Sequence, residues 1–174
     1  MTARARYDYR NCQSLLGYAA AVHRRSGGVC QLCGAQGGTD AFDFWRQLTV
    51  EHLIGKQQGG YLREIKLCLD DRFPELAPGE LAALAERLDE ANTVSACSFC
   101  NATTSRNRAN NSMGDLIVKA GDPESLEASV RVACAAILEA KRADVAWKIE
   151  SLRHAYDELV EPAVRAARST QNAG

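Results

Sequence analysis

Two Cys-x-x-Cys pairs constrain this chain more than any other feature of its sequence. The first pair is Cys30 and Cys33, and the second is Cys97 and Cys100. Two residues between cysteines let both thiolates reach one ion from a tight turn. Gly34 suits such a turn, because the backbone there must approach the sulfur atom. The two pairs therefore predict one tetrahedral zinc site that joins two distant segments of the chain.

The alternative for a single pair is a redox-active dithiol. Neither pair lies in an evident βαβ context, so a shared zinc ion explains the two pairs better. The chain has seven cysteines, an odd number that does not suit a disulfide framework. Four cysteine ligands fill the coordination sphere of zinc, so we expect a structural ion and a catalytic centre elsewhere.

Composition narrows the class of protein. Hydrophobic residues make up 46% of the 174 residues and charged residues 25%, as in a globular domain with a core. The formal net charge of -1 excludes a uniformly basic nucleic-acid-binding protein, so any such binding must use a local patch.

Without an apolar run of about 18 residues, we expect no membrane span. The N-terminal stretch lacks the apolar segment of a secretory signal, and we expect a cytoplasmic protein.

Hydrophobic periodicity and turn residues divide the chain into elements. In chain order, they predict a helix over 11–25, a strand within 41–54, a loop over 56–60, a helix over 78–91, a short β-permissive segment over 92–96, and helical sequence from 123 to about 168. Residues 61–76 fit no single pattern, and residues 101–114 are polar.

Apolar residues near the end of the chain follow alternating spacings of four and three. The members of this 145–163 seam are Val145, Ile149, Leu152, Tyr156, Leu159 and Ala163. Such spacing is typical of a coiled-coil-like packing face. We expect the seam to dock on the rest of the chain; the alternative is a homodimer or a larger complex formed through the same face.

A histidine that follows an acidic residue lies between the two cysteine pairs, and two asparagines flank the second pair. His52 follows Glu51 and precedes the loop that contains Gly59-Gly60. Asn92 comes shortly before the second cysteine pair, and Asn101 directly follows its last cysteine. The neighbouring carboxylate, loop and cysteine pairs distinguish His52 from the two other histidines of the chain, which we expect to be ordinary packed or solvated residues.

The order of these motifs resembles the HNH endonuclease family. The family motif corresponds to His52, Asn92 and Asn101, a His-Asn-Asn variant in which the last position is asparagine rather than histidine. The resemblance spans residues 30 to about 106. It implies a ββα-metal fold, in which two strands and a helix surround one catalytic divalent ion. The zinc knuckles would stabilise the bottom of this fold. The resemblance also implies hydrolysis of DNA phosphodiester bonds.

The resemblance assigns a role to each polar residue. A neutral imidazole can take the proton of the attacking water, so His52 would be the general base. Glu51 and Asn101 would be ligands of Mg²⁺ or Mn²⁺, which prefers oxygen donors, although the family usually has aspartate where this chain has Glu51. Neighbouring strand residues point to opposite faces, so Glu51 and His52 share a site only if the strand ends or bends there. Asn92 would hold the loop that carries His52 through side-chain hydrogen bonds.

We therefore expect an α+β protein built on a small ββα-metal core that a zinc site with four cysteine ligands braces. The N-terminal helix and its lead-in would occupy 1–29, the nuclease core 30–114, and a helical region for packing or dimerisation 115–174. The helix over 78–91 would be an insertion between the strands. DNA is the expected partner, with Arg106 and Arg108 as phosphate contacts beside the catalytic centre.

Two other functions remain open at this point. A zinc-knuckle nucleic-acid-binding module without catalysis would keep the cysteines and arginines but would need neither His52 nor Asn101. A helical interaction subunit would use the 145–163 seam to join a larger complex, which is compatible with nuclease activity.

Overall fold

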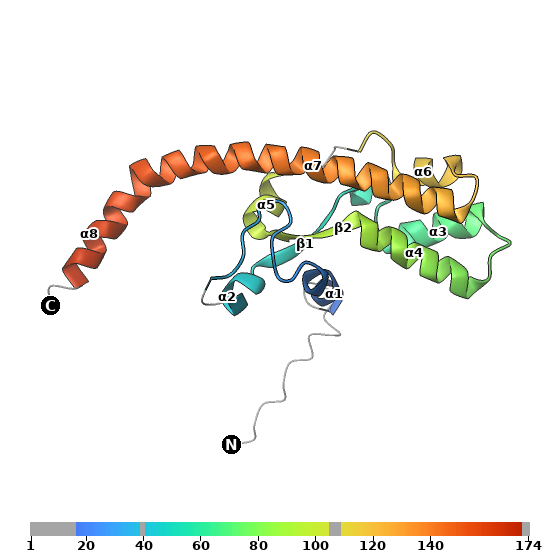
Figure 1. Cartoon of the computed structure of the whole chain (residues 1–174), viewed down its shortest axis with the longest axis horizontal. Helices are drawn as coiled ribbons and strands as arrows, with labels where there is room; N and C mark the ends of the chain where they lie inside the picture. Colours follow the sequence, from blue (N-terminus) through green and yellow to red (C-terminus); the bar gives the residue numbers. More distant parts are fainter. Residues whose placement is uncertain (1–16, 39–40, 105–108, 172–174) are drawn as a thin grey trace, which may run out of the picture.

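The structure is a computed structural model that describes residues 17–38, 41–104 and 109–171. Helices dominate it, and a two-stranded antiparallel sheet lies at its centre (Figure 1). The expected α+β class is confirmed at this level. The elements, in chain order, are α1 (Gly17–Arg25), α2 (Ala41–Trp45), β1 (Leu48–His52), the 3₁₀ turn η2 (Lys56–Gln58), α3 (Leu62–Arg72), α4 (Pro78–Asn92), β2 (Thr93–Cys97), α5 (Ser98–Thr103), α6 (Met113–Lys119), α7 (Pro123–Ala155), the π-helical segment η3 (Tyr156–Val160) and α8 (Glu161–Gln171).

The sheet places the second cysteine pair and His52 at opposite ends. Strands β1 and β2 run antiparallel, with Leu48 opposite Cys97 at one end and His52 opposite Thr93 at the other. Helix α5 follows β2 without a loop and contacts both strands, and α1 also contacts both. The end of β1 that carries His52 therefore lies at the opposite end of the sheet from Cys97.

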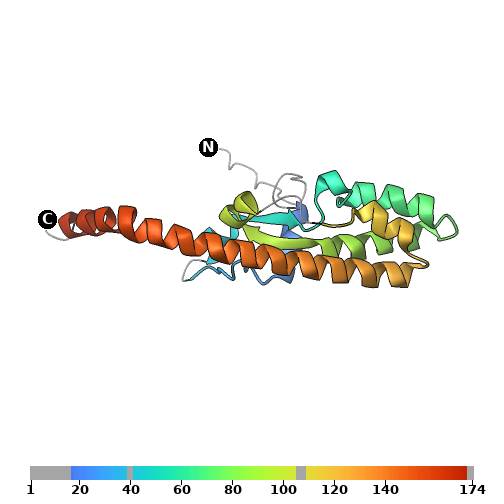
Figure 2. The same cartoon turned by 90° about the horizontal axis from the view of Figure 1, so that it is seen from above.

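The segment between the strands is a helical hairpin. Helix α4 begins at Pro78, a good first helical residue, and covers the predicted helix over 78–91. Residues 61–76, which fit no single pattern, form α3 over most of their length. Helix α3 packs against α4 and α6, and α4 packs against α7, at one end of the molecule (Figure 2). Buried side chains continue from this hairpin to the sheet and make one core.

A single long helix runs along the whole molecule. Asp122 caps α7, its side chain accepting a hydrogen bond from the N–H of Ser125, and Pro123 opens the helix. The π-helical segment η3 joins α7 to α8, and the helix extends past the core and then bends toward the side on which the sheet lies (Figure 1). The predicted helical sequence from 123 to about 168 is confirmed. Among the helices of the described ranges, none combines the length and the apolar character that a membrane crossing requires.

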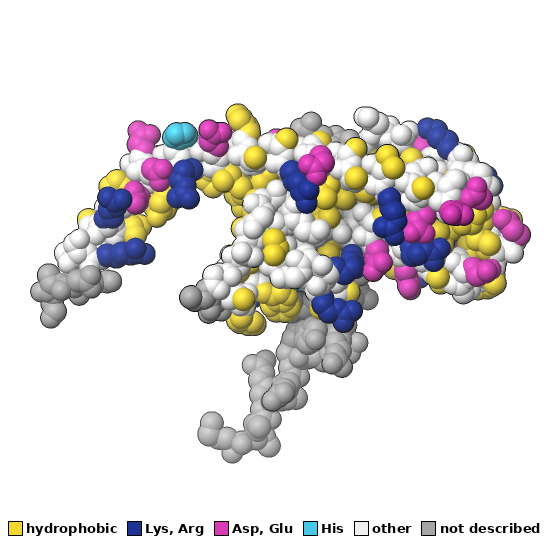
Figure 3. Space-filling view, in the orientation of Figure 1, with side chains coloured by type: hydrophobic (Ala, Val, Ile, Leu, Met, Phe, Trp, Pro, Cys, Tyr) yellow, Lys and Arg dark blue, Asp and Glu magenta, His cyan; other side chains and the backbone are white. Residues whose placement is uncertain are grey.

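The expected docking of the 145–163 seam on this chain holds only at its first position. Val145 is buried, but the next seam residues, Ile149, Leu152, Tyr156 and Leu159, are exposed. Leu159 is 73% exposed. Hydrophobic side chains are visible along the inner side of the bend in Figure 3.

The strand predicted within 41–54 is present only as β1, Leu48–His52. For the first residues of that range the prediction is wrong. Ala41–Trp45 forms the short helix α2, in which the Phe42 and Trp45 rings stack with centroids 6.1 Å apart. The Arg46 Nε donates to Asp43 Oδ1 at 2.6 Å, again three residues apart. These i,i+3 contacts suit a helical turn and not a strand. A short aromatic run does not by itself distinguish the two structures.

A candidate metal centre and a candidate active site

The four cysteines of the two pairs meet at one point. The Sγ atoms of Cys30, Cys33, Cys97 and Cys100 all lie within 4.8 Å of one another. Cys30 and Cys100 are buried, and the other two are partly exposed. Within the described ranges, this is the one group of three or more His, Cys, Asp or Glu side chains close enough to share an ion. The cluster can hold a metal ion.

The local backbone explains this geometry. In the first pair, Gly34 takes a φ of 75°, a left-handed conformation that favours glycine, and its N–H donates to the Cys30 carbonyl at 2.8 Å. The second pair spans the end of β2 and the first turn of α5. The Cys97 N–H points at the Cys30 sulfur, with an N···S distance of 3.3 Å. The two segments are thus joined around the sulfur atoms.

The surroundings of the four sulfur atoms shift the pKa of individual thiols in different directions. Burial raises the pKa of Cys33 to about 11 and also raises the pKa of Cys100. For Cys30, burial is opposed by N–H groups of Cys97, Cys33 and Leu32, which together lower the pKa. A bound cation stabilises thiolates and so counteracts the effect of burial. Metal binding at this cluster therefore displaces the thiol protons.

Asn92 joins the two ends of the segment between the strands. Its amide oxygen accepts the N–H of Ile54 at 2.7 Å, and its Nδ2 donates to the carbonyls of Ile54 at 3.1 Å and Gly60 at 2.7 Å. The side chain is fully buried, so each of these hydrogen bonds is shielded from water. Asn92 thus holds the loop that directly follows His52.

Gly60 is required by the closeness of this contact. A Cβ atom at this position would lie 1.7 Å from the Ile54 carbonyl oxygen and 2.9 Å from Asn92 Nδ2. Two backbone segments and one side chain therefore meet where only a glycine fits. This close approach explains why the second residue of the Gly59-Gly60 pair is a glycine.

Glu51, His52 and Asn101 line one hollow of about 390 Å³. The other walls come from η2 and from Tyr61 at the start of α3. Strand β1 ends at His52, which allows two consecutive residues to line the same hollow despite the alternation of a strand. The structure therefore brings three of the four predicted catalytic residues to one pocket, with Asn92 behind the loop.

The His52 ring is packed and electrically neutral near pH 7. It lies against the ring of Tyr61, with centroids 4.2 Å apart and planes at 37°. Burial lowers the pKa of His52 to about 4, because desolvation disfavours the imidazolium. A neutral imidazole in a hollow is able to accept a proton from a water molecule.

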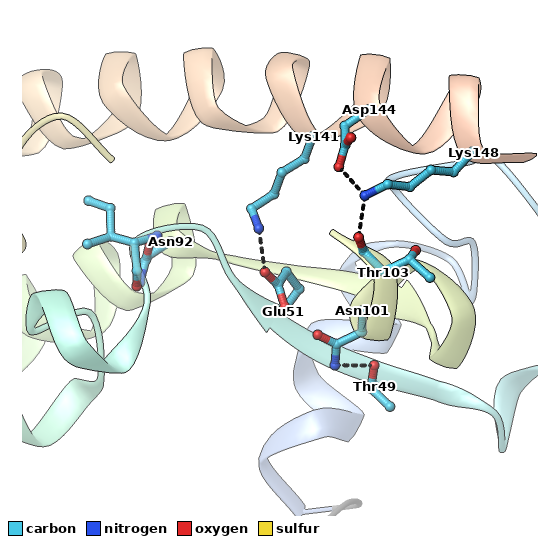
Figure 4. Close-up of polar contacts among 9 residues, drawn as sticks. Thr49, Glu51, Asn92, Asn101, Thr103, Lys141, Asp144 and Lys148 are labelled. Carbon is cyan, nitrogen blue, oxygen red and sulfur yellow. Dashed lines mark hydrogen bonds and ion pairs between the residues drawn. The ribbon is translucent and has the colours of Figure 1, made fainter. Parts of the chain in front are cut away.

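Glu51 is paired with a residue that lies outside the nuclease core predicted over 30–114. Its Oε1 lies 2.7 Å from the Nζ of Lys141 on α7 (Figure 4). Asn101 on α5 is oriented by strand β1, since its Nδ2 donates to Thr49 Oγ1 at 2.9 Å. The two oxygen-bearing side chains are thus positioned by different elements.

Two residues of the site were not predicted from the sequence. Tyr61 follows directly on Gly60, but nothing in its spacing marks it as a neighbour of His52. Lys141 carries a clearer signal: it interrupts the otherwise apolar buried stripe of α7, whose other members are Leu126, Val130, Cys134, Ile137 and Val145. A lysine in an apolar stripe indicates a buried partner. Arg106 and Arg108, the predicted phosphate contacts, lie outside the described residues.

Comparisons of this chain with protein-family models, with curated proteins and with solved structures find no match.

Proposed function

We propose that this protein is a metal-dependent endonuclease of the HNH type that hydrolyses DNA phosphodiester bonds. The observation that carries the proposal is the hollow that gathers Glu51, His52 and Asn101, with Asn92 fixing the loop beside it. The packing of α5 against β1 and β2 supports a ββα-metal core, because this helix directly follows the second strand.

In this proposal, His52 is the general base. Its imidazole takes a proton from the water that attacks the phosphorus atom, which requires the neutral form that burial favours through a lowered pKa. Tyr61 packs against the ring and limits its orientation. Asn92 acts at one remove by holding the loop after His52.

Two different metal sites belong to the proposal. The four cysteines hold a structural zinc ion, since thiolates in a tetrahedral set suit zinc and leave no open position. Glu51 and Asn101 offer a carboxylate and an amide oxygen, a donor set that fits Mg²⁺ or Mn²⁺ with several retained waters. When bound there, the divalent ion supplies charge neutralisation for the phosphate and the leaving oxygen.

Cleavage of supercoiled plasmid tests this function. We expect nicked or linear product with Mg²⁺ or Mn²⁺ and none with a chelator that leaves the cysteine-bound zinc in place. Tight binding of DNA without cleavage, with each divalent ion and with both plasmid and short duplex substrates, would instead support a non-catalytic zinc-knuckle binding module.

Replacement of Asn101 by alanine tests the ligand assignment. We expect the Mg²⁺ concentration for half-maximal cleavage to rise about tenfold or more, because one oxygen donor is lost. Thr49→Val is a matched control: it removes the hydroxyl that orients Asn101 but leaves the donor, so its effect should be smaller. An unchanged Mg²⁺ titration in Asn101→Ala would remove this residue from the metal shell.

The 145–163 seam provides the proposed self-association surface. Its large apolar residues beyond Val145 are exposed, and their spacing of four and three suits a second helix of the same kind. Two copies joined there would bring two candidate active sites into one particle, one for each DNA strand.

Charge in this seam should separate the copies. We expect a dimer for the wild type and a monomer of 18.9 kDa for a variant with Leu152→Glu and Leu159→Glu, by light scattering after gel filtration. Val132→Glu is the control, because Val132 is 72% exposed on α7 but lies outside the seam. A wild-type monomer at protein concentrations in the micromolar range would refute self-association through this face.

A further inference from the structure

Lys141 is a buried cation in a position where the helix otherwise presents apolar side chains. Its side chain is 2% exposed, and that of Glu51 is 12% exposed. An ammonium group loses its hydration when it is buried, so it is tolerated only with a close counter-charge. The Glu51 carboxylate provides that charge at 2.7 Å (Figure 4).

The partner of this lysine is the residue that the proposed function assigns to a divalent ion. A carboxylate that already binds an ammonium group attracts a second cation less strongly, and the two cations repel each other at short range in a poorly hydrated site. The long, flexible stem of lysine also allows the ammonium to move without any change in α7. Glu51 is thus placed between the protein's own cation and the hollow.

We propose that Lys141 is a positioning residue that holds the Glu51 carboxylate at the wall of the hollow and competes with the divalent cation for it. This inference rests on the proposed function, because that function makes Glu51 a ligand. It also assigns α7 a part in the candidate site, although α7 belongs to the region that was expected to serve only packing or dimerisation.

Competition makes a prediction that simple structural pairing does not. If Lys141 only stabilises the fold, its removal lowers the melting temperature and leaves the metal affinity of the hollow unchanged. If it competes, its removal strengthens metal binding, even where the fold is weakened. Metal affinity measured without DNA therefore separates the two roles.

The experiment is a Mn²⁺ titration of the full zinc-containing chain by calorimetry, with no DNA present. We expect Lys141→Met to bind Mn²⁺ at least about tenfold more tightly than the wild type, and Lys141→Arg to retain the wild-type affinity. Lys148→Met is the matched control, because Lys148 lies on the same helix but pairs with Asp144 and the Thr103 carbonyl. Its Mn²⁺ affinity should equal that of the wild type.

Glu51→Gln distinguishes a failure of this inference from a failure of the proposed function. Mn²⁺ binding that Glu51→Gln removes, but that Lys141→Met leaves essentially at the wild-type affinity, overturns the competition and leaves the nuclease proposal intact. Wild-type Mn²⁺ binding that Glu51→Gln does not alter overturns the ligand assignment, and the competition with it.

A measurement on the unmutated residue covers the case in which Lys141→Met does not fold. In wild-type protein labelled with ¹⁵N-lysine, the Nζ resonance of Lys141 should shift when Mg²⁺ is added, while that of Lys148 should not. An unshifted Lys141 resonance at Mg²⁺ concentrations that saturate the Glu51-dependent site overturns the proposal.

Discussion

Replacement of Cys100 by alanine is expected to unfold the region around the sheet. Cys100 is fully buried, and its sulfur lies with three others that hold the first cysteine turn against β2 and α5. Zinc binding contributes roughly 10–16 kcal/mol to folding in small zinc domains, and the total stability of a domain is only about 5–15 kcal/mol. We expect either no cooperative thermal transition or a melting temperature lower by at least about 15 °C. Cys97→Ala should behave in the same way.

Cys68→Ala provides the control for this experiment. Cys68 is a partly exposed cysteine on α3 that lies outside the cluster, so its loss should change the melting temperature by only a few degrees. Zinc content should be about one ion per chain in the wild type and in the control. A Cys100→Ala protein with an unchanged melting temperature would exclude a structural metal at the four cysteines.

Replacement of His52 by alanine is expected to lower the rate of DNA cleavage by about 10²–10⁴-fold, the usual contribution of a general base. The zinc content and the fold should be retained, because His52 is only half-buried and lies at the opposite end of the sheet from Cys97. Plasmid cleavage under identical Mg²⁺ and salt conditions measures the effect. His154→Ala is the control, since His154 is exposed near the end of α7. Equal cleavage by the wild type and His52→Ala would remove His52 from the reaction.

The pH dependence provides a second test of the same residue. Because the pKa of His52 is lowered to about 4, the imidazole stays neutral as the pH falls through about 6.5, where an exposed histidine gains its proton. The neutral base is lost only as the pH approaches the lowered pKa. The cleavage rate of the free enzyme should therefore be insensitive to this group above about pH 5. A fall in kcat/KM centred near the pKa of an exposed histidine would show that the ring is solvated in the active protein.

The sequence predicts the parts of this protein that depend on short spacings. Two residues between cysteines already specify a tight turn. Pro78 and Asp122-Pro123 mark helix starts through their own backbone chemistry. In each case the signal is local, and the structure contains the corresponding local geometry.

The remaining features depend on contacts between distant segments. The helical state of Ala41–Trp45 arises together with its packing, including the contact of Trp45 with His23, which a run of aromatic residues does not reveal. The pairing of Lys141 with Glu51 joins residues of α7 and β1 that are 90 positions apart in the sequence, and only the final fold brings them together. The seam spacing predicts a packing face but not its partner, and in the structure most of that face, from Ile149 to Leu159, is exposed rather than covered by the same chain.

The contacts of Asn92 also explain why a long connection between the strands is tolerated. Because its side chain holds the Gly60 carbonyl at 2.7 Å, the α3–α4 hairpin leaves and re-enters the sheet at nearly the same point. The entropic cost of closing such a loop grows only slowly, by about 0.6 kcal/mol for each doubling of its length. The geometry around His52 is therefore decoupled from the size of the hairpin. Insertions or deletions at the far tip of the hairpin, between Phe73 and Ala77, should therefore leave the positions of His52 and of the loop after it unchanged.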